Sequence, residues 1–332
     1  MYTIVDVAKY CGVSTATVSM ALNNKGRLSP ATRAKVLEAV DKLGYVYNQT
    51  AANLRNNESN QVGLLLNDIT NPFYSELTLS LNQEMELHNK MLFLANSEDS
   101  PERQRRIIES FISHKVGGMV ICPALGLDLD FLVTLKRRQI PVVLAVRNLE
   151  IADYDFVGTD NFQGARLITQ HLINLGHRKI AFLGGMQGSK TRANRLAGYI
   201  SVLLENDINL ETKYSFTCES NRKASEIMMN GILDHYPEIT AVICYQDIVA
   251  FGAMRALHTR NINIGKEIAL TGFDDIPEAA DTHPELTTIS VSAKEIGRKA
   301  GEVLLKRIHG NTENPQHIII PPTLIIRHSC GS

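Results

Sequence analysis

The feature that most constrains the fold of this chain is an alternation of short apolar runs with longer amphipathic segments. From residue 61 onward, the runs "VGLLLN", "MLFLANS", "GGMVICPA" and "IPVVLAV" alternate with segments of helical periodicity near 73–88, 102–114 and 128–138. A second series follows, formed by "DFVGTD", "KIAFLGG", "YSFTCES", "TAVICYQD" and "EIALTGF". Fully apolar strands that alternate with helices indicate parallel sheets covered on both faces. We therefore expect two doubly wound α/β subdomains.

Polar residues follow several of these apolar runs, where the expected strands end. They are Asn67, Asp68, Asp160, Gln246, Asp247, Asp274 and Asp275. In doubly wound sheets, ligands bind beyond the carboxyl ends of the strands, so several of these side chains should converge on one cleft. Carboxylates and amides hydrogen-bond hydroxyl groups, and the neighbouring aromatic pair Phe73-Tyr74 can stack on a sugar ring. The pattern indicates a small polyhydroxylated ligand, but for each aspartate taken alone, capping of the following helix is the favoured interpretation.

Three short helical patterns precede this body. The first opens with a capping box of Thr3 and Asp6 and ends at Gly12, because glycine adopts the left-handed C′ conformation at little cost. Ser14 is a suitable N-cap for the second helix, and Ser29 for the third. A helix, a tight turn with glycine and a second short helix form a helix-turn-helix, whose second helix enters the DNA major groove.

The outward face of the second helix carries only small or uncharged side chains. These are Thr15, Ala16, Ser19 and Met20. An exposed helix normally carries long charged residues on its solvated face, so this face suits close approach to another surface. The pattern favours DNA binding over the alternative, which is a three-helix bundle without a ligand.

Charge is distributed unevenly between the N-terminal segment and the rest of the chain. Residues 1–57 carry an excess of four positive charges, whereas the whole chain has a net charge of −1. A small basic segment on a mildly acidic body is typical of a nucleic-acid-binding head joined to a sensor or an enzyme. Ordinary scatter of surface charge is the alternative that charge alone leaves open.

The run "VDVAKYCGVSTATVSMALN" resembles the signature of the LacI/GalR family of bacterial transcription regulators. The matching motifs are Asp6-Val7-Ala8, Gly12-Val13-Ser14, Thr17-Val18-Ser19 and Leu22-Asn23. The resemblance implies that Thr15, Ala16 and Met20 read bases, and Met20 stands where relatives commonly carry arginine. A bidentate guanine contact, worth about 1–3 kcal/mol, is therefore absent there, and apolar contact with a thymine methyl group is favoured. The DNA contacts expected on this basis are Thr3, Ser14, Thr15, Ala16, Thr17, Ser19, Met20, Asn23, Asn48, Leu54 and Arg55.

A polar linker, "NQTAANLRNNESN", spans residues 48–60. Asn48 can cap a helix of about seven residues, which is too short to persist alone in water, so we expect this helix to form only on DNA. A passive tether is the alternative. The family resemblance implies a hinge helix that pairs across a dimer and inserts Leu54 into the minor groove, with Arg55 beside it. Tyr47 stands where relatives usually carry proline, a departure that bears on how the chain enters the hinge.

The resemblance continues over nearly the whole chain. Segments that look like family landmarks are "NDITNPFY", "GTDNFQGA", "LGHRKIAFLGG", "TRANRLAGY", "GFDDI" and "ELTTI". They imply the type I periplasmic-binding-protein fold, and the ending "IIIPPTLI" is similar to the maltose-regulon repressor branch of the family. Effector contacts would then fall to Phe73, Tyr74, Asp160, Arg195, Gln246 and Asp274, with Arg147 after the fourth strand as a further candidate. Gln246 replaces an asparagine that is frequent in relatives, so the ligand can differ in size or reach.

Other features argue against catalysis, metal binding and export. "GGMQGSKT" misses the P-loop spacing because Ser189 separates the glycine from the lysine, and the dispersed histidines form no H-E-x-x-H motif. We expect no cofactor and no metal site. Five scattered cysteines indicate buried thiols in a reducing compartment. The N-terminus lacks the apolar core of a secretory signal and no apolar stretch approaches 18 residues, which predicts a cytoplasmic protein without membrane contact.

These observations predict an N-terminal all-α helix-turn-helix head and an α/β body of two doubly wound parallel-sheet subdomains. The expected boundaries are 1–47 for the head, 48–60 for the hinge and 61–332 for the effector-binding and dimerisation domain. Within the body, the two subdomains are expected at roughly 61–158 plus 291–320 and 159–290 plus 321–328.

The predicted function is that of a homodimeric transcriptional repressor. A small carbohydrate effector bound between the subdomains would control its affinity for a near-palindromic operator in double-stranded DNA. The absence of a heptad tail after "PPTLIIRH" favours a dimer over a tetramer. Two alternatives stay open: an exported solute-binding protein of a transport system with the same body fold, and a repressor that has lost its ligand response.

The hinge hypothesis makes a direct prediction for Leu54. Insertion of an apolar side chain between base pairs costs a few kcal/mol of unstacking, which the contacts on the bent duplex offset. Leu54→Ala should therefore weaken operator binding in a gel-shift titration and leave effector binding intact in calorimetry. Equal operator affinity for the variant and the unaltered protein would refute the wedge.

Overall fold

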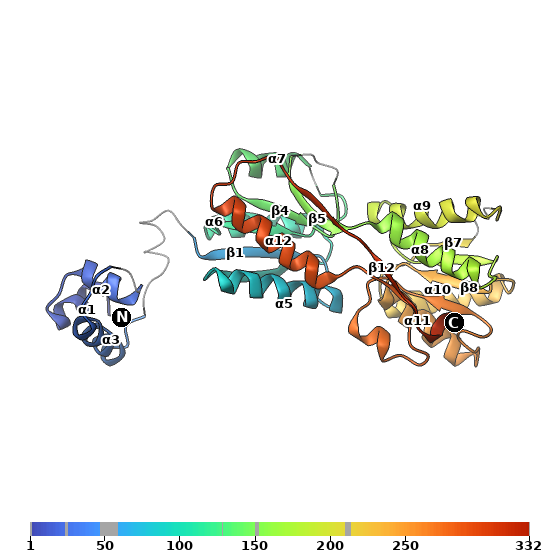
Figure 1. The fold of residues 1–332 in the computed structure, drawn as a ribbon, viewed down its shortest axis with the longest axis horizontal. Helices are drawn as coiled ribbons and strands as arrows, with labels where there is room; N and C mark the ends of the chain where they lie inside the picture. The colour runs from blue at the N-terminus through green and yellow to red at the C-terminus, as the bar shows by residue number, and fades with distance from the viewer. Residues whose placement is uncertain are drawn as a thin grey trace. The chain divides into compact units, whose positions relative to one another are not determined.

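The computed structural model describes residues 2–23, 26–46, 59–127, 129–149, 153–209 and 214–331 (Figure 1). It divides into two compact units, Met1–Ser59 and Asn60–Ser332, which we call the head and the body. No described helix combines the length and the apolar character that crossing a lipid bilayer requires.

The head consists of three helices around a small apolar core. They are α1 (Ile4–Cys11), α2 (Thr15–Leu22) and α3 (Pro30–Leu43). Each helix contributes buried side chains to that core, which contains Val7, Ala8, Cys11, Val18, Ala21, Val36 and Ala39. The predicted helix ends are confirmed. Asp6 Oδ2 accepts the Thr3 N–H at 2.8 Å, and Gly12 has a φ of +64°.

The second and third helices also begin as predicted. The Ser14 hydroxyl accepts the Thr17 N–H at 3.1 Å, and the Ser29 hydroxyl accepts the Thr32 N–H at the same distance. These caps satisfy backbone donors that have no partner inside a helix. The turn between α1 and α2 is therefore set by local hydrogen bonds together with the packing of Val7 and Val18 in the shared core.

The first subdomain of the body is a six-stranded parallel sheet in the order β11-β5-β4-β3-β1-β2. Its strands are β1 (Gln61–Leu66), β2 (Met91–Asn96), β3 (Gly118–Ile121), β4 (Val142–Ala145), β5 (Asp155–Thr159) and β11 (His317–Ile320). Helices α5 (Pro72–Leu87) and α12 (Ala293–Ile308) cover one face, and α6 (Pro101–Ser113) and α7 (Leu129–Arg137) cover the other (Figure 1). The central strands β1, β3, β4 and β5 are buried on both faces, which explains why they are largely apolar, whereas the edge strands β2 and β11 keep exposed side chains.

The second subdomain is a four-stranded parallel sheet in the order β7-β6-β8-β9. Its strands are β6 (Ile180–Leu183), β7 (Ser215–Phe216), β8 (Ala241–Cys244) and β9 (Ala269–Thr271). Helices α8 (Asn161–Asn174) and α9 (Lys190–Glu205) pack on one face, and α10 (Arg222–His235) and α11 (Asp247–Thr259) pack on the other. The short 3-10 helices η2 (Pro277–Ala280) and η3 (His328–Cys330) lie in the same subdomain, where η3 contacts β9.

The chain crosses three times between the two subdomains. It passes from β5 to α8, from β10 (Thr288–Ser290) to α12, and from β11 to β12 (Thr323–Ile325), which pairs antiparallel with β10. Two crossings run side by side, because the Thr159 hydroxyl donates to the Ile320 carbonyl at 3.0 Å. The subdomains are thus joined by several short segments, which suits relative movement about them.

The strand formed by "DFVGTD" lies at the boundary between the two series of apolar runs. This run heads the second series in the sequence, although the expected boundary at residue 158 leaves most of it in the first subdomain. In the structure β5 pairs with β4 and β11 and so belongs to the first sheet. A fully apolar run records that a strand is buried on both faces and does not record its hydrogen-bonding partner. All nine runs are otherwise strands, from β1 to β9.

Close packing of α5 against α12 depends on Gly297. A Cβ at this position would lie 2.2 Å from the Ser80 hydroxyl oxygen and 2.3 Å from the Leu77 carbonyl oxygen. Gly297→Ala should therefore force the helices apart and lower the unfolding free energy of the body by about 1–3 kcal/mol. A Cβ at Gly231 on α10 would have no other atom within 4 Å, so Gly231→Ala is the matched control and should be neutral or stabilising. Urea unfolding that ranks Gly297→Ala at or above Gly231→Ala would contradict this packing.

Candidate ligand cavity and nucleic-acid interface

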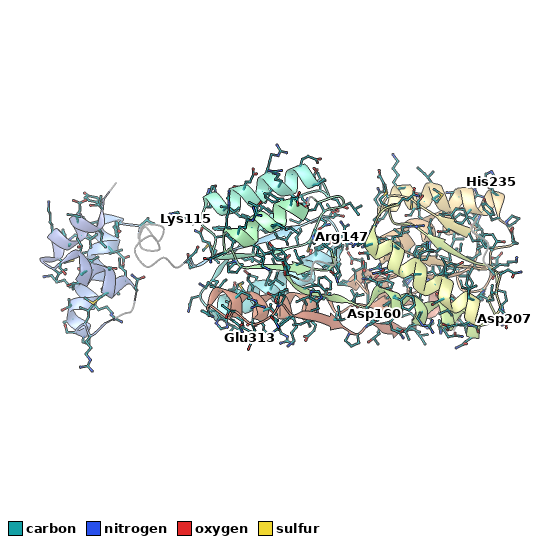
Figure 2. All side chains as sticks on the ribbon, turned by 90° about the horizontal axis from the view of Figure 1, so that it is seen from above. Lys115, Arg147, Asp160, Asp207, His235 and Glu313 are labelled. Carbon is teal, nitrogen blue, oxygen red and sulfur yellow. The ribbon has the colours of Figure 1, made fainter. Side chains whose placement is uncertain are left out.

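A cavity of about 470 Å³ lies where the carboxyl ends of the two sheets face each other. Both subdomains contribute to its wall. Asn67, Tyr74, Asp99 and Arg147 belong to the first, and Asn161, Ser189, Arg195, Tyr245, Gln246 and Asp274 belong to the second. Figure 2 shows Arg147 and Asp160 at the junction of the two lobes. A ligand in this cavity would contact both subdomains at once.

Most of the side chains expected to contact an effector line the cavity together. They are Phe73, Tyr74, Arg147, Arg195, Gln246 and Asp274. Asp160 is not among the lining residues. Its carboxylate accepts the Gln163 N–H at 2.9 Å and so caps α8, which is the interpretation that the sequence favours for each aspartate taken alone. Its neighbours Thr159 and Asn161 line the wall instead.

Arg147 is held by a carboxylate on the same side of the cavity. Its two terminal nitrogens donate to the two oxygens of Asp99 at 2.5 and 3.0 Å, and Nη1 also donates to the Pro123 carbonyl at 3.1 Å. This bidentate geometry is the strong form of an arginine–carboxylate pair. The fork fixes the guanidinium plane at the wall before any ligand arrives.

Arg195, which lies on α9, is the arginine that the second subdomain contributes to the wall. Its Nε donates to Asn161 Oδ1 at 2.8 Å, and Nη1 donates to the Tyr245 carbonyl. Nη2 lies 3.5 Å from Asp274 Oδ1, and the guanidinium stands 3.5 Å from the centre of the Phe273 ring. A buried cation needs such partners to offset its lost hydration. The packing presents the arginine edge and the Asp274 carboxylate to the cavity.

Asp274 is the most strongly perturbed acid on the wall. Burial raises the pKa of its carboxyl to about 7, and the nearby positive charge of Arg195 opposes that shift. The carboxylate also accepts a hydrogen bond from Gln246 Nε2 at 3.1 Å. Its backbone φ is +118°, a conformation that residues other than glycine rarely adopt and that is found at functional sites. An ionised Asp274 can accept hydrogen bonds from ligand hydroxyl groups.

Phe73 and Tyr74 contribute aromatic surface to the wall, which also contains other apolar residues. Both are buried at the start of α5, and their rings pack edge to face with centres 5.1 Å apart. Asn71 caps this helix, because its Oδ1 accepts the Phe73 N–H at 3.0 Å. The cap fixes where the helix begins and therefore where these rings lie.

Two strand-end aspartates have structural roles. Asp247 is fully buried and accepts hydrogen bonds from the Thr288 hydroxyl at 2.5 Å and the Ile276 N–H at 2.9 Å. Asp275 forms an ion pair with Arg327 at 2.8 Å. Both aspartates attach the loop after β9 to the second subdomain. Their carboxylates therefore stabilise the fold, and neither aspartate lines the cavity.

Sequence reasoning missed three residues that shape the wall: Asp99, Asn161 and Tyr245. Asp99 follows the end of β2 by three residues, so the rule of strand ends could have found it. Asn161 and Tyr245 accept hydrogen bonds from Arg195. No sequence pattern identifies the hydrogen-bond partners of a cavity residue. Among the described side chains, no group of three or more His, Cys, Asp or Glu residues is placed to hold a metal ion.

The candidate DNA-contacting face lies on α2 of the head. Ala16 is exposed, and Thr15, Thr17, Ser19 and Met20 are half-exposed. Several polar groups nearby are already hydrogen-bonded within the head. The Ser14 and Thr17 hydroxyls are 2.9 Å apart, Asn23 Nδ2 donates to the Ser19 carbonyl at 2.9 Å, and the Thr3 hydroxyl donates to Asp6 at 2.7 Å. The predicted contacts Asn48, Leu54 and Arg55 lie outside the described residues.

Two family descriptions match the chain. Residues 59–328 match "Periplasmic binding proteins and sugar binding domain of LacI family", and residues 3–48 match "Bacterial regulatory proteins, lacI family". The maltose regulon regulatory protein MalI of Escherichia coli (strain K12) is 35% identical, over 97% of this chain and 97% of its own length.

Solved structures of similar proteins agree with the fold. A transcriptional regulator CelR–cellobiose complex has a TM-score of 0.76 and 27% identity, covering 99% of this chain and 100% of its own. A lac repressor dimer bound to operator and the anti-inducer ONPF has a TM-score of 0.89 at 24% identity, covering 100% of this chain and 99% of its own. The predicted combination of a helix-turn-helix head and a body of two doubly wound sheets is confirmed.

The buried acids predict how the stability of the body depends on pH. Burial raises the pKa of Asp274 to about 7 and that of Asp247 to about 6, both above the ordinary value of 3.8. Between about pH 4 and 7 these two acids therefore retain protons in the folded chain that they have released in the unfolded chain, so their contribution to stability falls as the pH rises. Asp274→Asn should reduce this slope by up to about 1.4 kcal/mol per pH unit, leaving the contribution of Asp247. Urea titrations at pH 5, 6 and 7 measure the slope, and an unchanged slope in the variant would contradict the shift.

Proposed function

The chain belongs to the LacI family of bacterial regulatory proteins. We propose that it is a transcriptional repressor whose affinity for operator DNA is controlled by a sugar. The family is one of DNA-binding transcriptional regulators with a sugar-binding domain. The observation that carries the proposal is the pairing, in one chain, of a capped helix-turn-helix with a cavity built from both lobes of the body.

We propose that α2 enters the major groove of the operator. Thr15, Ala16 and Met20 would face base edges, while Thr3, Ser14, Thr17, Ser19 and Asn23 would contact the backbone or position the helix. Without a long donor on this face, recognition rests on van der Waals contact with groups such as thymine methyls. The positive excess of residues 1–57 would supply the sequence-independent attraction to phosphates.

We propose that residues 48–60 form the hinge between head and body. In this proposal Asn48 caps a short helix on DNA, Leu54 enters the minor groove and Arg55 approaches the backbone. The body then consists of the subdomains 61–158 plus 291–320 and 159–290 plus 321–328, with the effector between them.

The proposed effector is a carbohydrate held by both subdomains. Tyr74 and Phe73 offer an apolar surface for a sugar ring, while Asp274, Gln246, Arg195 and Arg147 offer hydrogen bonds to its hydroxyl groups. The CelR complex holds cellobiose, and MalI is named for a maltose regulon, which supports a sugar as the class of ligand. The cavity has room for a monosaccharide or a disaccharide.

Control of DNA binding would follow from the contacts that one ligand makes with two lobes. A ligand stabilises the relative orientation of the lobes in which all of its contacts form, and this orientation is passed to the hinges. Coupling of about 1–3 kcal/mol is typical of such allosteric pairs of sites. The sugar raises operator affinity if the lobe orientation that it stabilises favours pairing of the hinges, and lowers operator affinity if the other orientation does.

We propose that the protein acts as a homodimer. The edge strand β2 and the neighbouring helix α5 expose apolar side chains, namely Leu79, Leu87, Met91 and Leu94, of which Leu87 is 77% exposed. Clustered exposed apolar residues mark interaction surfaces. Two heads of a symmetric dimer would read a near-palindromic site, and the chromosomal target would place the protein in the cytoplasm. We expect regulation rather than catalysis, because the relatives are regulators.

Selection from a random pool of DNA duplexes tests the function directly. The unaltered protein should enrich a motif with two-fold symmetry, as expected for a dimer with two heads. Ala16→Glu should reduce affinity for the enriched site at least tenfold, since a carboxylate on the exposed face of α2 would approach base edges and phosphates. Leu37→Glu adds the same charge to the exposed side of α3 and is the matched control. Failure to enrich any duplex over bulk competitor, with or without a panel of sugars, would refute the proposal.

A further inference from the structure

Charged side chains on the cavity wall are mainly carboxylates. Among the residues that the structure describes, five carboxylates and two guanidinium groups line it. The carboxylates belong to Asp68, Glu98, Asp99, Glu219 and Asp274, and the guanidinium groups to Arg147 and Arg195. Glu98 and Glu219 are exposed and screened by solvent, but Asp274 is buried. Even with Asp274 protonated, the wall carries four carboxylates against two guanidinium groups, so it presents an excess of negative charge to an incoming ligand.

Both arginines are already committed to protein oxygens. Arg147 uses both terminal nitrogens on Asp99, and Arg195 divides its donors among Asn161, the Tyr245 carbonyl and Asp274. A phosphate group is recognised by guanidinium donors in the same bidentate manner as a carboxylate. An anionic ligand would therefore have to displace a protein carboxylate and leave that carboxylate unpaired beside it.

The helix ends at the wall do not compensate. Six helices, α5, α8, α9, α10, α11 and α12, have a cap or first-turn residue at the wall, and helix N-termini commonly bind phosphate through open N–H groups. At α5, α9 and α10 the caps Asn71, Ser189 and Asn221 each accept an N–H from two or three residues later, at 3.0, 3.3 and 2.8 Å. At α8 the Asp160 carboxylate accepts the Gln163 N–H at 2.9 Å, and at α11 the first residue is the buried carboxylate Asp247. The first turn of α12 has no side-chain cap and carries the carboxylate of Glu295. Protein oxygens thus stand where a phosphate would need donors.

We propose that the cavity selects a neutral polyhydroxylated ligand and rejects phosphate esters of sugars, with the Arg147–Asp99 fork as the main discriminating element. Hydroxyl groups donate to the carboxylates that an anion would face, so the same wall that repels a phosphate favours an uncharged sugar. This inference rests on the proposed function in one respect, because it takes the cavity to be the effector site.

Inorganic phosphate probes the fork without knowledge of the effector. Calorimetry at constant ionic strength should find no saturable binding of phosphate by the full-length protein. Asp99→Asn removes the negative charge and replaces the fork oxygen opposite Arg147 Nη2 by a donor, so Nη2 becomes available and phosphate should bind to this variant at least roughly tenfold more tightly. Asp68→Asn is the matched control, since it removes the same charge from the same wall without freeing an arginine.

A double variant assigns the gain to the arginine. Asp99→Asn combined with Arg147→Met should lose the phosphate binding that Asp99→Asn acquires, and thermal unfolding would verify that each variant is folded. Equal phosphate binding by Asp99→Asn and Asp68→Asn would overturn the proposal. So would phosphate binding by the unaltered protein that Arg147→Met abolishes.

Paired sugars separate failure of this inference from failure of the proposed function. Glucose, maltose and cellobiose would each be titrated against the corresponding 6-phosphate, and any neutral sugar that binds should do so at least tenfold more tightly than its ester. Tighter or equal binding of an ester would overturn the charge selection and leave a sugar-responsive regulator intact. Loss of operator selection, by contrast, would refute the function whatever the phosphate titrations show.

Discussion

Parallel strand pairing with both faces covered is the constraint on which the rest of the body depends. Backbone donors and acceptors within each sheet are satisfied by neighbouring strands, and helices bury both faces, so the strand ends are where polar side chains can gather without a cost to the core. Because the carboxyl ends of the two sheets face each other, the polar groups of both form one cavity. The position of the site is thus a consequence of topology, and its specificity is a consequence of a few side chains.

Charge neutralisation at the cavity takes place within each lobe and not across the cleft. Arg147 and Asp99 both belong to the first subdomain, and Arg195 and Asp274 both belong to the second. Movement of the lobes as rigid bodies would therefore break neither pair. A bound ligand that contacts both lobes can then decide their orientation, since these ion pairs do not oppose the change.

Much of the secondary structure of the head and body could be predicted from the sequence, because it depends on local residue patterns. Apolar runs identified all nine strands from β1 to β9, and the caps at Thr3, Ser14 and Ser29 follow from residue type and spacing. The partners of β5 could not be read in this way, because pairing depends on distant segments such as β11. The same holds for Asn161 and Tyr245, whose role is to orient Arg195 and is fixed only once α8 and β8 lie beside α9.

Asp99 and Asp160 show why residue type at a strand end does not decide between capping and lining. Both are aspartates at the carboxyl edge of the first sheet, but Asp160 immediately precedes α8 and its carboxylate is taken by the Gln163 N–H. Asp99 precedes a helix whose cap is Ser100, so its carboxylate is free to turn toward Arg147. Because Ser100 caps the helix, the carboxylate of Asp99 is not needed for capping. The number of residues between a strand and its helix, together with what occupies the cap, determines which aspartate reaches the cavity.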